Sequence, residues 1–319
     1  MRRYRSVMGW APFGLILLTA CLPQLPDNTT APPPERSVVS QAEGVTFWSE
    51  PGMSDALWAE IARPDGTGSV GGYLSTTPAS RNSLIILLHG ASTFDVDGRT
   101  GAARRFHDNP GRFYREAGFV TFSLDFRECG TPYGQGDLED LVQVIDWLDA
   151  GGKQVLGVER VYTLGYSVGG TSVILANRQR RVTAAASIGG VTHSAEYQNS
   201  WLAFSLAGLL YPDNQGLCQL RETMAAYGPP GSPGWSLFDT VAQIHELTSP
   251  MIVVQGTEDQ IYSIRNAQLL QAAYQEAISS GATLPPLEFL LLPGQDHFAP
   301  IASPEVVQAI IAFFDRFGG

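Results

Sequence analysis

The chain has 319 residues, of which 44% are hydrophobic and 16% are charged, a composition typical of a globular protein with one large core or two small ones. Its formal net charge is −11, and Lys153 is its single lysine. A surface so poor in basic groups cannot release counterions from a nucleic-acid backbone, which excludes nucleic acid as a partner.

The first twenty residues have the pattern of a signal peptide. Arginines at positions 2, 3 and 5 precede an apolar run from Val7 to Ala20, which is shorter than the roughly 20 residues that span a membrane. The run ends in Leu-Thr-Ala-Cys, which resembles the bacterial lipoprotein signal, in which the cysteine is acylated and becomes the first mature residue. Cys21 is therefore predicted to anchor an exported protein to the bacterial cell envelope, in the periplasm or on the outer surface. The alternative is an ordinary cysteine near a cleavage site.

Residues 21–40 are predicted to form an extended tether that leads from the anchor to the folded domain, residues 41–319. Five prolines and two adjacent threonines in this segment favour a solvated, extended chain. Two further cysteines, Cys129 and Cys218, would lie in a compartment where disulfides persist. The two cysteines could form a disulfide or remain two separate buried thiols. The sequence leaves both alternatives open, because it does not set the distance between the two α-carbons.

The folded domain is predicted to be of the α/β class, with a mostly parallel sheet and helices on both faces. Three short strands at 45–48, 57–62 and 70–74, with turn residues between them, indicate an antiparallel entry to the sheet. Apolar runs without alternation follow, as is typical of strands buried on both faces, and helical patterns separate several of them. The predicted inner strands are 84–88, 119–124, 160–164, 184–188, 251–255 and 287–291, and the predicted helices are 113–117, 138–148, 170–177, 264–278 and 304–317.

Residues 194–247 interrupt this alternation. They contain helical patterns at 201–210 and 217–227 and a stretch rich in proline and glycine at 228–234. Insertions of this length are often functional, so the segment is predicted to form a small helical lid; the alternative is an elaboration that only packs on the domain. Three aromatic residues of the segment are candidates for contact with substrate if they face a cleft: Trp201, Phe204 and Trp235.

Ser167 is the candidate nucleophile. It occupies the centre of Gly165-Tyr166-Ser167-Val168-Gly169, directly after the predicted strand 160–164 and before a predicted helix. A serine between a strand and a helix lies in a sharp turn, and glycines two residues before and after it remove side chains that would collide there. The hydroxyl is then exposed at the positive end of the helix, where it can attack a substrate.

With this motif between its strand and its helix, the chain resembles an α/β-hydrolase from about Val70 to Phe317. His89-Gly90, at the end of the predicted strand 84–88, is similar to the oxyanion segment of that family. The resemblance implies that the backbone N–H groups of Ala91 and Val168 stabilise the charge that develops on a substrate carbonyl oxygen. His89 itself is interpreted as a support for the loop.

The resemblance also supplies the other two members of a catalytic triad. Asp259 follows the predicted strand 251–255 at the position of the family's acid, and the adjacent Glu258 is the alternative. His297 follows the last predicted strand at the position of the family's base, a context that the other four histidines lack. Serine, aspartate and histidine also occur in the chain order of the family. No metal ion or organic cofactor is expected, and Asp95-Val96-Asp97-Gly98 is interpreted as a turn.

Further motifs reduce the number of reactions that the resemblance allows. Three features are similar to the branch that contains dienelactone hydrolases and prolyl-oligopeptidase-type peptidases: Gly170 directly after the motif, the segment Asp125-Phe126-Arg127 and the entry from Val70 to Leu74. Dienelactone hydrolases use a cysteine nucleophile, however, and the segment before residue 70 is too short for the propeller of such peptidases. Hydrolysis of a small-molecule carboxylic ester is therefore the first expectation, and peptidase or amidase action on a short peptide is the second. A lipid-anchored binding protein on an inactive hydrolase scaffold is the third.

Overall fold

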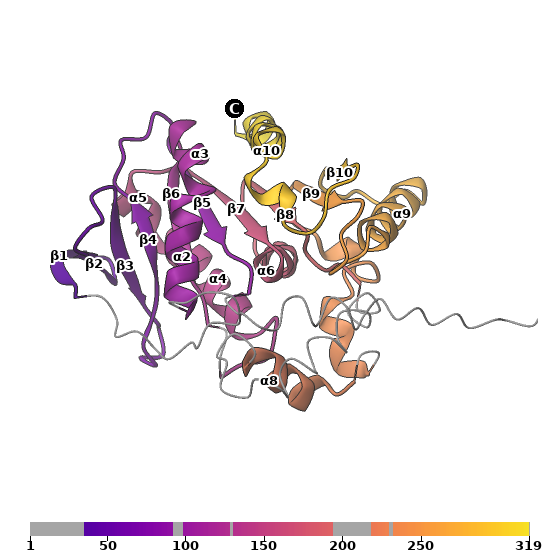
Figure 1. Cartoon of the computed structure of the whole chain (residues 1–319), viewed down its shortest axis with the longest axis horizontal. Helices are drawn as coiled ribbons and strands as arrows, with labels where there is room; N and C mark the ends of the chain where they lie inside the picture. The colour runs from indigo at the N-terminus through magenta and orange to yellow at the C-terminus, as the bar shows by residue number, and fades with distance from the viewer. Residues whose placement is uncertain (1–34, 92–97, 128–129, 194–217, 230–231, 319) are drawn as a thin grey trace, which may run out of the picture.

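A computed structural model describes residues 35–91, 98–127, 130–193, 218–229 and 232–318. The signal peptide, Cys21, most of the predicted tether, Cys129 and the side chain of Cys218 lie outside the described residues. Within these residues the chain forms a ten-stranded sheet in the order β1-β2-β3-β4-β6-β5-β7-β8-β9-β10 (Figure 1). The strands are β1 (Ser37–Ala42), β2 (Val45–Ser49), β3 (Ala56–Ala62), β4 (Ser69–Ser75), β5 (Ser83–Leu88), β6 (Val120–Asp125), β7 (Arg160–Tyr166), β8 (Ala184–Ile188), β9 (Met251–Gly256) and β10 (Leu287–Leu292).

The sheet changes from antiparallel to parallel along its width. Strands β1 to β4 pair antiparallel, and β4 also pairs antiparallel with β6. From β6 to β10 the pairings are parallel, so the carboxyl ends of these strands meet at one edge of the sheet. The antiparallel entry and the nine strands that the sequence predicts are thereby confirmed.

The edge strand β1 corrects the predicted boundary between tether and domain. The sequence predicts an extended tether up to residue 40, whereas Ser37–Ala42 pairs with β2. All six residues of β1 are exposed, so the strand is stabilised by backbone hydrogen bonds and not by burial. A strand without a buried face needs no alternation of apolar and polar residues, which is why no pattern in the sequence predicts it.

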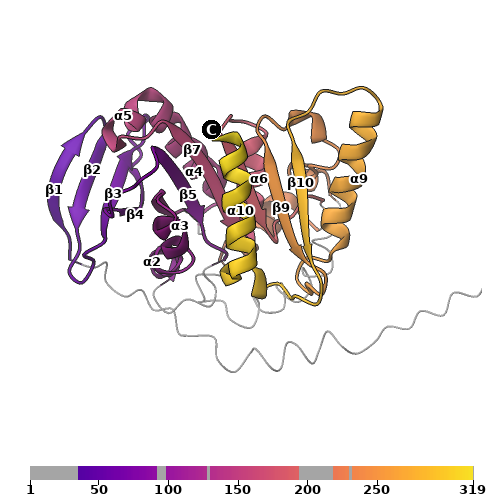
Figure 2. The same ribbon diagram turned by 90° about the horizontal axis from the view of Figure 1, so that it is seen from above.

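Helices cover both faces of the sheet, which confirms the predicted fold class (Figure 2). Strand β5 contributes alternate residues to the two cores: Leu84, Ile86 and Leu88 to one, and Ile85 and Leu87 to the other. No helix of the described residues is long and apolar enough to cross a membrane. One face carries α2 (Gly98–Asp108), α3 (Gly111–Glu116) and α10 (Pro304–Phe317), and the other carries α4 (Gly136–Trp147), its extension η3 (Leu148–Gly152) with α5 (Lys153–Leu156), α6 (Val168–Asn177) and α9 (Arg265–Ser279).

Helix α2 is not predicted from the sequence. Two glycines occur in its first turn, and its buried apolar residues are the small Ala102 and Ala103 together with Phe106. Such a composition lacks a strong apolar period of 3.6 residues. The helix is stabilised by tertiary contacts instead; the Ser123 hydroxyl of β6, for example, donates to the Ala103 carbonyl oxygen at 2.6 Å.

The predicted lid insertion is described only in its second half. Residues 194–217 lie outside the described residues, and the rest forms α8 (Cys218–Tyr227) and 3₁₀ turns at Pro233–Phe238 and Ile244–Glu246. Helix α8 is hydrogen-bonded to the loop after β6. The Tyr227 hydroxyl donates to the Tyr133 carbonyl oxygen at 2.8 Å, and the Tyr133 N–H donates to Thr223 Oγ1 at 2.9 Å. Because β6 ends at the same edge of the sheet as β7, this half of the insertion lies at the edge that carries Ser167.

Asp137 is a buried carboxyl group between α4 and α6. It lies in the first turn of α4, is 1% exposed, and accepts a hydrogen bond of 2.5 Å from the Ser172 hydroxyl of α6. Burial raises the pKa of Asp137 from 3.8 to about 6, although the hydrogen bond from Ser172 opposes the rise. The neutral acid is therefore the form that stabilises the fold. This stabilisation is complete below about pH 4 and is lost as the pH rises through about 6.

Asp137→Asn is expected to remove this pH dependence, because an amide has the same shape and does not ionise. A shift of about two pKa units corresponds to about 3 kcal/mol of stability. The free energy of unfolding of the variant is therefore expected to exceed that of the wild type by about 2–3 kcal/mol at pH 8 and to equal it at pH 4. Denaturant titrations at both pH values measure this difference.

The control is Asp146→Asn, which removes a half-exposed carboxyl group from the same helix. Its free energy of unfolding should stay within about 1 kcal/mol of the wild type at either pH. An Asp137→Asn difference of the same size at pH 4 and pH 8 would contradict the proposed ionisation of the buried group.

Candidate active site

The turn between β7 and α6 holds Ser167 in a strained conformation. Its φ of 55° and ψ of −117° lie outside the regions that residues with side chains normally adopt. The Ser167 N–H donates to the Ile188 carbonyl oxygen of β8 at 2.8 Å, which helps to hold the turn in place. The half-buried serine immediately precedes α6, at the position that the sequence predicts.

Two glycines make this turn possible. A Cβ atom at Gly165 would lie 2.1 Å from the carbonyl oxygen of Gly169, and one at Gly169 would lie 2.5 Å from the carbonyl oxygens of Leu88 and His89. Any side chain at either position would therefore displace backbone atoms. The absence of these side chains lets β7, α6 and the end of β5 approach so closely that the loop after β5 lies against Ser167.

The structure brings Ser167, His297 and Asp259 together from three loops at the carboxyl edge of the sheet. Ser167 follows β7, Asp259 follows β9, and His297 follows β10. His297 Nε2 lies 3.0 Å from Ser167 Oγ, and His297 Nδ1 lies 2.7 Å from Asp259 Oδ2. The side chains of His297 and Asp259 are 3% and 1% exposed, so their hydrogen bond is shielded from water.

Asp259 is held in one orientation by several donors. Its Oδ1 accepts the backbone N–H groups of Ile261 and Tyr262, each at 2.8 Å, and its Oδ2 accepts the Gln255 side-chain amide at 2.7 Å. An ionised carboxylate can only accept, so His297 donates from Nδ1. Its Nε2 is then free of a proton and can accept a hydrogen bond from the Ser167 hydroxyl.

Gln255 is a positioning residue that the sequence does not reveal. Its Nε2 donates both to Asp259 Oδ2 and to the Tyr262 carbonyl oxygen, the latter at 2.9 Å. The side chain is fully buried at the end of β9, four residues before the aspartate. A polar residue that ends an apolar strand is the only signal that could have indicated it.

The alternatives to these residues lie in other surroundings. Glu258 is exposed, next to the buried Asp259. His107 is buried, with its Nε2 3.5 Å from Asp55 Oδ2, and His193 Nε2 lies 4.0 Å from Asp239 Oδ2. Ser167 is therefore hydrogen-bonded to His297, and His297 to Asp259, which are the histidine and the acid that the sequence favours.

The loop after β5 lies beside the serine. His89 is buried and stacks on Phe126 with ring centres 4.3 Å apart, and the Gly169 N–H of α6 donates to its carbonyl oxygen at 3.2 Å. A Cβ atom at Gly90 would lie 3.3 Å from Ser167 Cβ, so glycine allows this close approach. His89 thus packs as a support for the loop. The N–H groups of Ala91, in this loop, and of Val168, the first residue of α6, remain the predicted oxyanion donors.

Three aromatic rings of the described residues surround His297. The ring centres of Tyr166, Phe298 and Tyr262 lie 5.2, 5.4 and 5.5 Å from that of the imidazole. Burial, and then the nearby Asp259 carboxylate, raise the pKa of Tyr166 well above its ordinary value, so its phenol stays neutral beside the histidine. The rings provide an apolar wall that limits the access of water to the imidazole.

The structure places one of the three lid candidates. Trp201 and Phe204 lie outside the described residues. Trp235 is 1% exposed, packs against Tyr227 and Phe238 with ring centres 5.8 and 5.6 Å away, and donates from Nε1 to the Gly228 carbonyl oxygen. Trp235 also belongs to the main hydrophobic core together with residues of α6 such as Leu175, so it adopts the arrangement that packs on the body of the protein.

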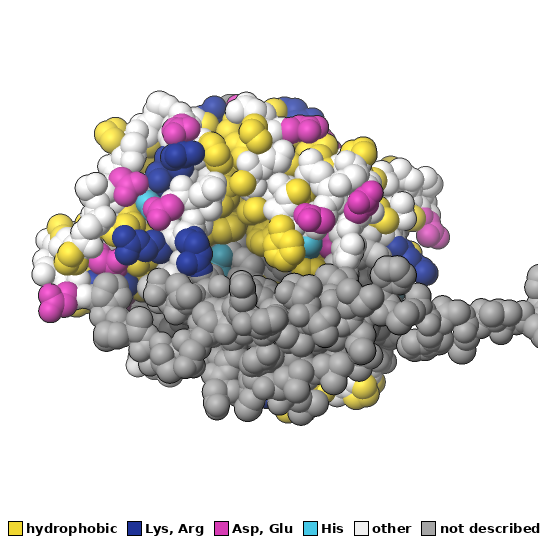
Figure 3. Space-filling view, viewed as in Figure 1, with side chains coloured by type: hydrophobic (Ala, Val, Ile, Leu, Met, Phe, Trp, Pro, Cys, Tyr) yellow, Lys and Arg dark blue, Asp and Glu magenta, His cyan; other side chains and the backbone are white. Residues whose placement is uncertain are grey.

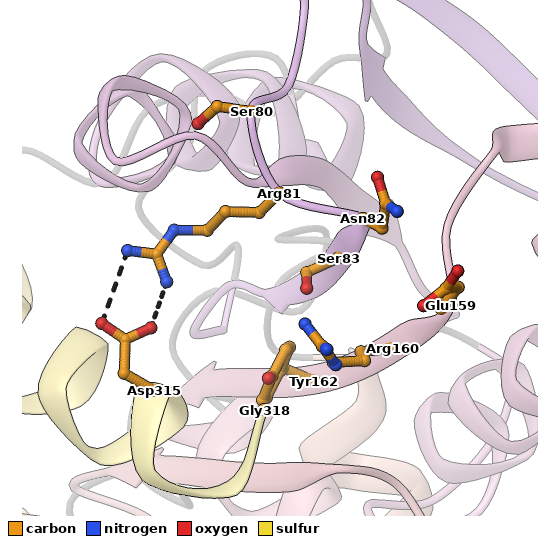
Figure 4. Close-up of a pocket in the computed structure, with 9 residues that line it drawn as sticks. All are labelled: Ser80, Arg81, Asn82, Ser83, Glu159, Arg160, Tyr162, Asp315 and Gly318. Atoms are coloured by element: carbon orange, nitrogen blue, oxygen red, sulfur yellow. Dashed lines mark hydrogen bonds and ion pairs between the residues drawn. The ribbon is translucent and has the colours of Figure 1, made fainter.

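A separate polar pocket of about 270 Å³ lies at the opposite edge of the sheet (Figure 4). It is lined by residues at the amino ends of β5 and β7, including Ser83 and Arg160, and by the end of α10. Arg81 is ion-paired there with Asp315. The pocket is therefore distinct from the Ser167 site. Among the described residues, no group of three His, Cys, Asp or Glu side chains is arranged to hold a metal ion.

Solved structures similar to this chain share its fold. An esterase from Pyrococcus furiosus superposes with a TM-score of 0.61 at 14% identity, over 90% of this chain and 98% of that one. An esterase of the bacterial hormone-sensitive lipase family gives 0.55 at 19% identity, over 84% and 85%. A puromycin-hydrolyzing peptidase from Mycobacterium tuberculosis gives 0.56 at 14% identity, over 86% of this chain and 46% of that one. At such identities the similarity shows the fold alone.

A family model supplies the remaining comparison. A search of curated proteins found no match to the chain. Residues 85–310 match the model of the alpha/beta hydrolase family, a span that includes Ser167, Asp259 and His297. This match extends from β5 to α10 and thus over the whole parallel part of the sheet. The chain therefore belongs to the alpha/beta hydrolase family.

Proposed function

We propose that this protein is a serine hydrolase that cleaves carboxylic esters through an acyl-enzyme intermediate. The observation that carries the proposal is the continuous series from Ser167 Oγ through both nitrogens of His297 to Asp259 Oδ2, with links of 3.0 and 2.7 Å. The serine lies in a strained turn, which is typical of a residue held in position for chemistry. A non-catalytic binding protein would not require this series.

The proposed reaction has two halves. In the first, Ser167 Oγ attacks the ester carbonyl carbon while His297 Nε2 takes the hydroxyl proton, and the carbonyl oxygen becomes an oxyanion stabilised by the Ala91 and Val168 N–H groups. The oxyanion collapses, the bond to the alcohol oxygen breaks, and that oxygen takes the proton from His297. In the second half, His297 Nε2 takes a proton from a water molecule as the water oxygen attacks the acyl carbon. The bond from that carbon to Ser167 Oγ then breaks and Oγ takes the proton from His297, which releases the acid and restores Ser167.

Of the two reactions that such a site could catalyse, ester hydrolysis is the first proposal and amide hydrolysis the second. Two of the three similar structures named above are esterases and one is a peptidase. The motifs around Ser167 and Asp125 are similar to the branch of dienelactone hydrolases and prolyl-oligopeptidase-type peptidases, whose members act on both kinds of bond.

Purified protein assayed on p-nitrophenyl esters of graded acyl length, and on aminoacyl and prolyl p-nitroanilides, tests the ranking. All these substrates release a chromophore, so their kcat/KM values can be compared directly. We expect turnover of the esters and much slower turnover of the anilides. Faster turnover of an anilide would favour the peptidase, and the absence of turnover on every substrate would favour a binding protein.

We also propose that the enzyme works outside the cytoplasm, attached to a membrane by a lipid on Cys21. The support is the apolar leader that ends in Leu-Thr-Ala-Cys and the proline-rich segment after it. Membrane fractionation of the full-length chain beside its Cys21→Ser variant tests this, since an unchanged membrane share in the variant would refute the anchor.

A further inference from the structure

Phe298 is an exposed aromatic residue directly after His297. It is 58% exposed, the largest value among the exposed large hydrophobic residues of the described part of the chain. On the face of the molecule that Figure 3 shows, hydrophobic side chains gather and continue to the margin of the undescribed residues. An apolar surface that reaches a reactive site is suited to bind an apolar ligand.

The backbone holds Phe298 in place. Its own N–H and that of Ala299 both donate to Asp296 Oδ1 at 2.9 Å. The chain then enters the 3₁₀ turn Ala299–Ala302, in which Pro300 is buried. The exposed ring thus belongs to a hydrogen-bonded turn, which keeps it close to the imidazole.

Of the three rings that the described residues place around His297, only that of Phe298 is mainly exposed. Tyr262 is 4% exposed and Tyr166 is half-buried, so these two rings are largely covered by protein. The Phe298 ring stands nearly perpendicular to the imidazole, at 87°, with ring centres 5.4 Å apart. A ligand that reaches His297 can therefore still cover the free surface of Phe298.

We infer that Phe298 contacts the alcohol part of the ester and favours substrates with an apolar, ring-sized alcohol. The inference rests on the proposed function. His297 must deliver its proton from Nε2 to the departing oxygen, so the alcohol lies on the His297 side of the reacting carbon. The acyl part stays bonded to Ser167 Oγ through that step and needs its own space. Phe298, adjacent to His297, is thus assigned to the alcohol and not to the acyl chain.

The test varies the alcohol and the acyl part separately in wild type and Phe298→Ala. One series keeps the acetyl group and changes the alcohol from methyl to phenyl to 2-naphthyl; the other keeps the methyl alcohol and lengthens the acyl chain from acetyl to octanoyl. The ratio of wild-type to variant kcat/KM is taken for each ester, so the intrinsic reactivity of the ester cancels. We expect this ratio to reach about tenfold or more for 2-naphthyl acetate, mainly through KM, and to be smallest for methyl acetate.

Two further variants separate contact with substrate from damage to the fold. Phe298→Leu keeps an apolar side chain and should restore part of the loss on the aryl acetates. Ile278→Ala removes another exposed apolar side chain, on α9, and should leave every ratio near one.

The outcomes test the inference about Phe298 separately from the proposed ester hydrolysis. A ratio of kcat/KM values that rises with acyl length and not with alcohol size would overturn the inference. An equal loss of kcat/KM on all esters would also overturn it, because such a loss would indicate an effect on His297 itself. Either result leaves ester hydrolysis by the wild type intact. The absence of ester hydrolysis in the wild type would instead overturn the proposed function.

Discussion

Ser167→Ala is expected to lower kcat for ester hydrolysis by about 10⁶-fold, as removal of the serine does in another Ser-His-Asp triad. The variant lacks the oxygen that forms the acyl-enzyme, so only residual stabilisation by neighbouring groups remains. Alanine has nearly the same backbone preferences as serine, so the strained turn is expected to persist. Steady-state kinetics and labelling by an active-site fluorophosphonate measure the effect, and the label should be lost.

The matched control is Ser172→Ala, on the same helix. Ser172 is fully buried, and its Oγ lies 2.5 Å from Asp137 Oδ2 and 3.1 Å from the Val168 carbonyl oxygen. The fluorophosphonate should therefore still label this variant at Ser167, since accessibility and the His297 base decide reactivity. Labelling that persists unchanged in Ser167→Ala would refute the assignment of the nucleophile.

Asp259→Asn is expected to lower kcat by about 10⁴-fold, the size of effect known from the same substitution in another triad. The reason lies in the donors around the side chain. Oδ1 accepts two backbone N–H groups, from Ile261 and Tyr262, so the amide oxygen of the variant is expected to stay at that position. The NH₂ group then faces His297 Nδ1 and donates to it. The histidine proton is forced onto Nε2, which can no longer accept the proton of Ser167.

Glu258→Gln is the matched control for this prediction. It makes the same chemical change at the adjacent, exposed carboxylate. We expect its kcat to remain within about twofold of the wild type, because the exposed side chain lies outside the hydrogen-bonded series. A loss at Glu258 as large as the loss at Asp259 would show that the acid is wrongly assigned.

The elements of the fold were largely predictable because most of them carry a local pattern. Apolar runs such as 84–88 mark strands buried on both faces, and these runs coincide with observed strands. The exceptions lack the pattern for a physical reason. Strand β1 buries no side chain and depends on backbone pairing with β2, and α2 buries mostly alanine and depends on contacts with residues remote in the sequence, such as Ser123.

Residues that assist the site were harder to predict than the candidate triad. Ser167 has glycines at fixed positions around it, and Asp259 and His297 each follow a predicted strand. Gln255 and Phe298 have no such signal, because a polar residue at the end of a strand and an apolar residue after a turn are both common. Only their neighbours in space, Asp259 and His297, suggest roles for them.

The sequence by itself determined the class of the fold, the sharp turn at Ser167 and the order of the candidate residues along the chain. These features follow from patterns a few residues long: apolar periodicity, glycine spacing and the turns after strands. The tertiary structure alone decided that Asp259 and not Glu258 faces His297, that Trp235 packs inward and that Phe298 stays exposed beside the imidazole. The physical reason is distance along the chain, since His297 is 38 residues from Asp259 and 130 from Ser167, and only the folded sheet brings such residues within hydrogen-bonding range.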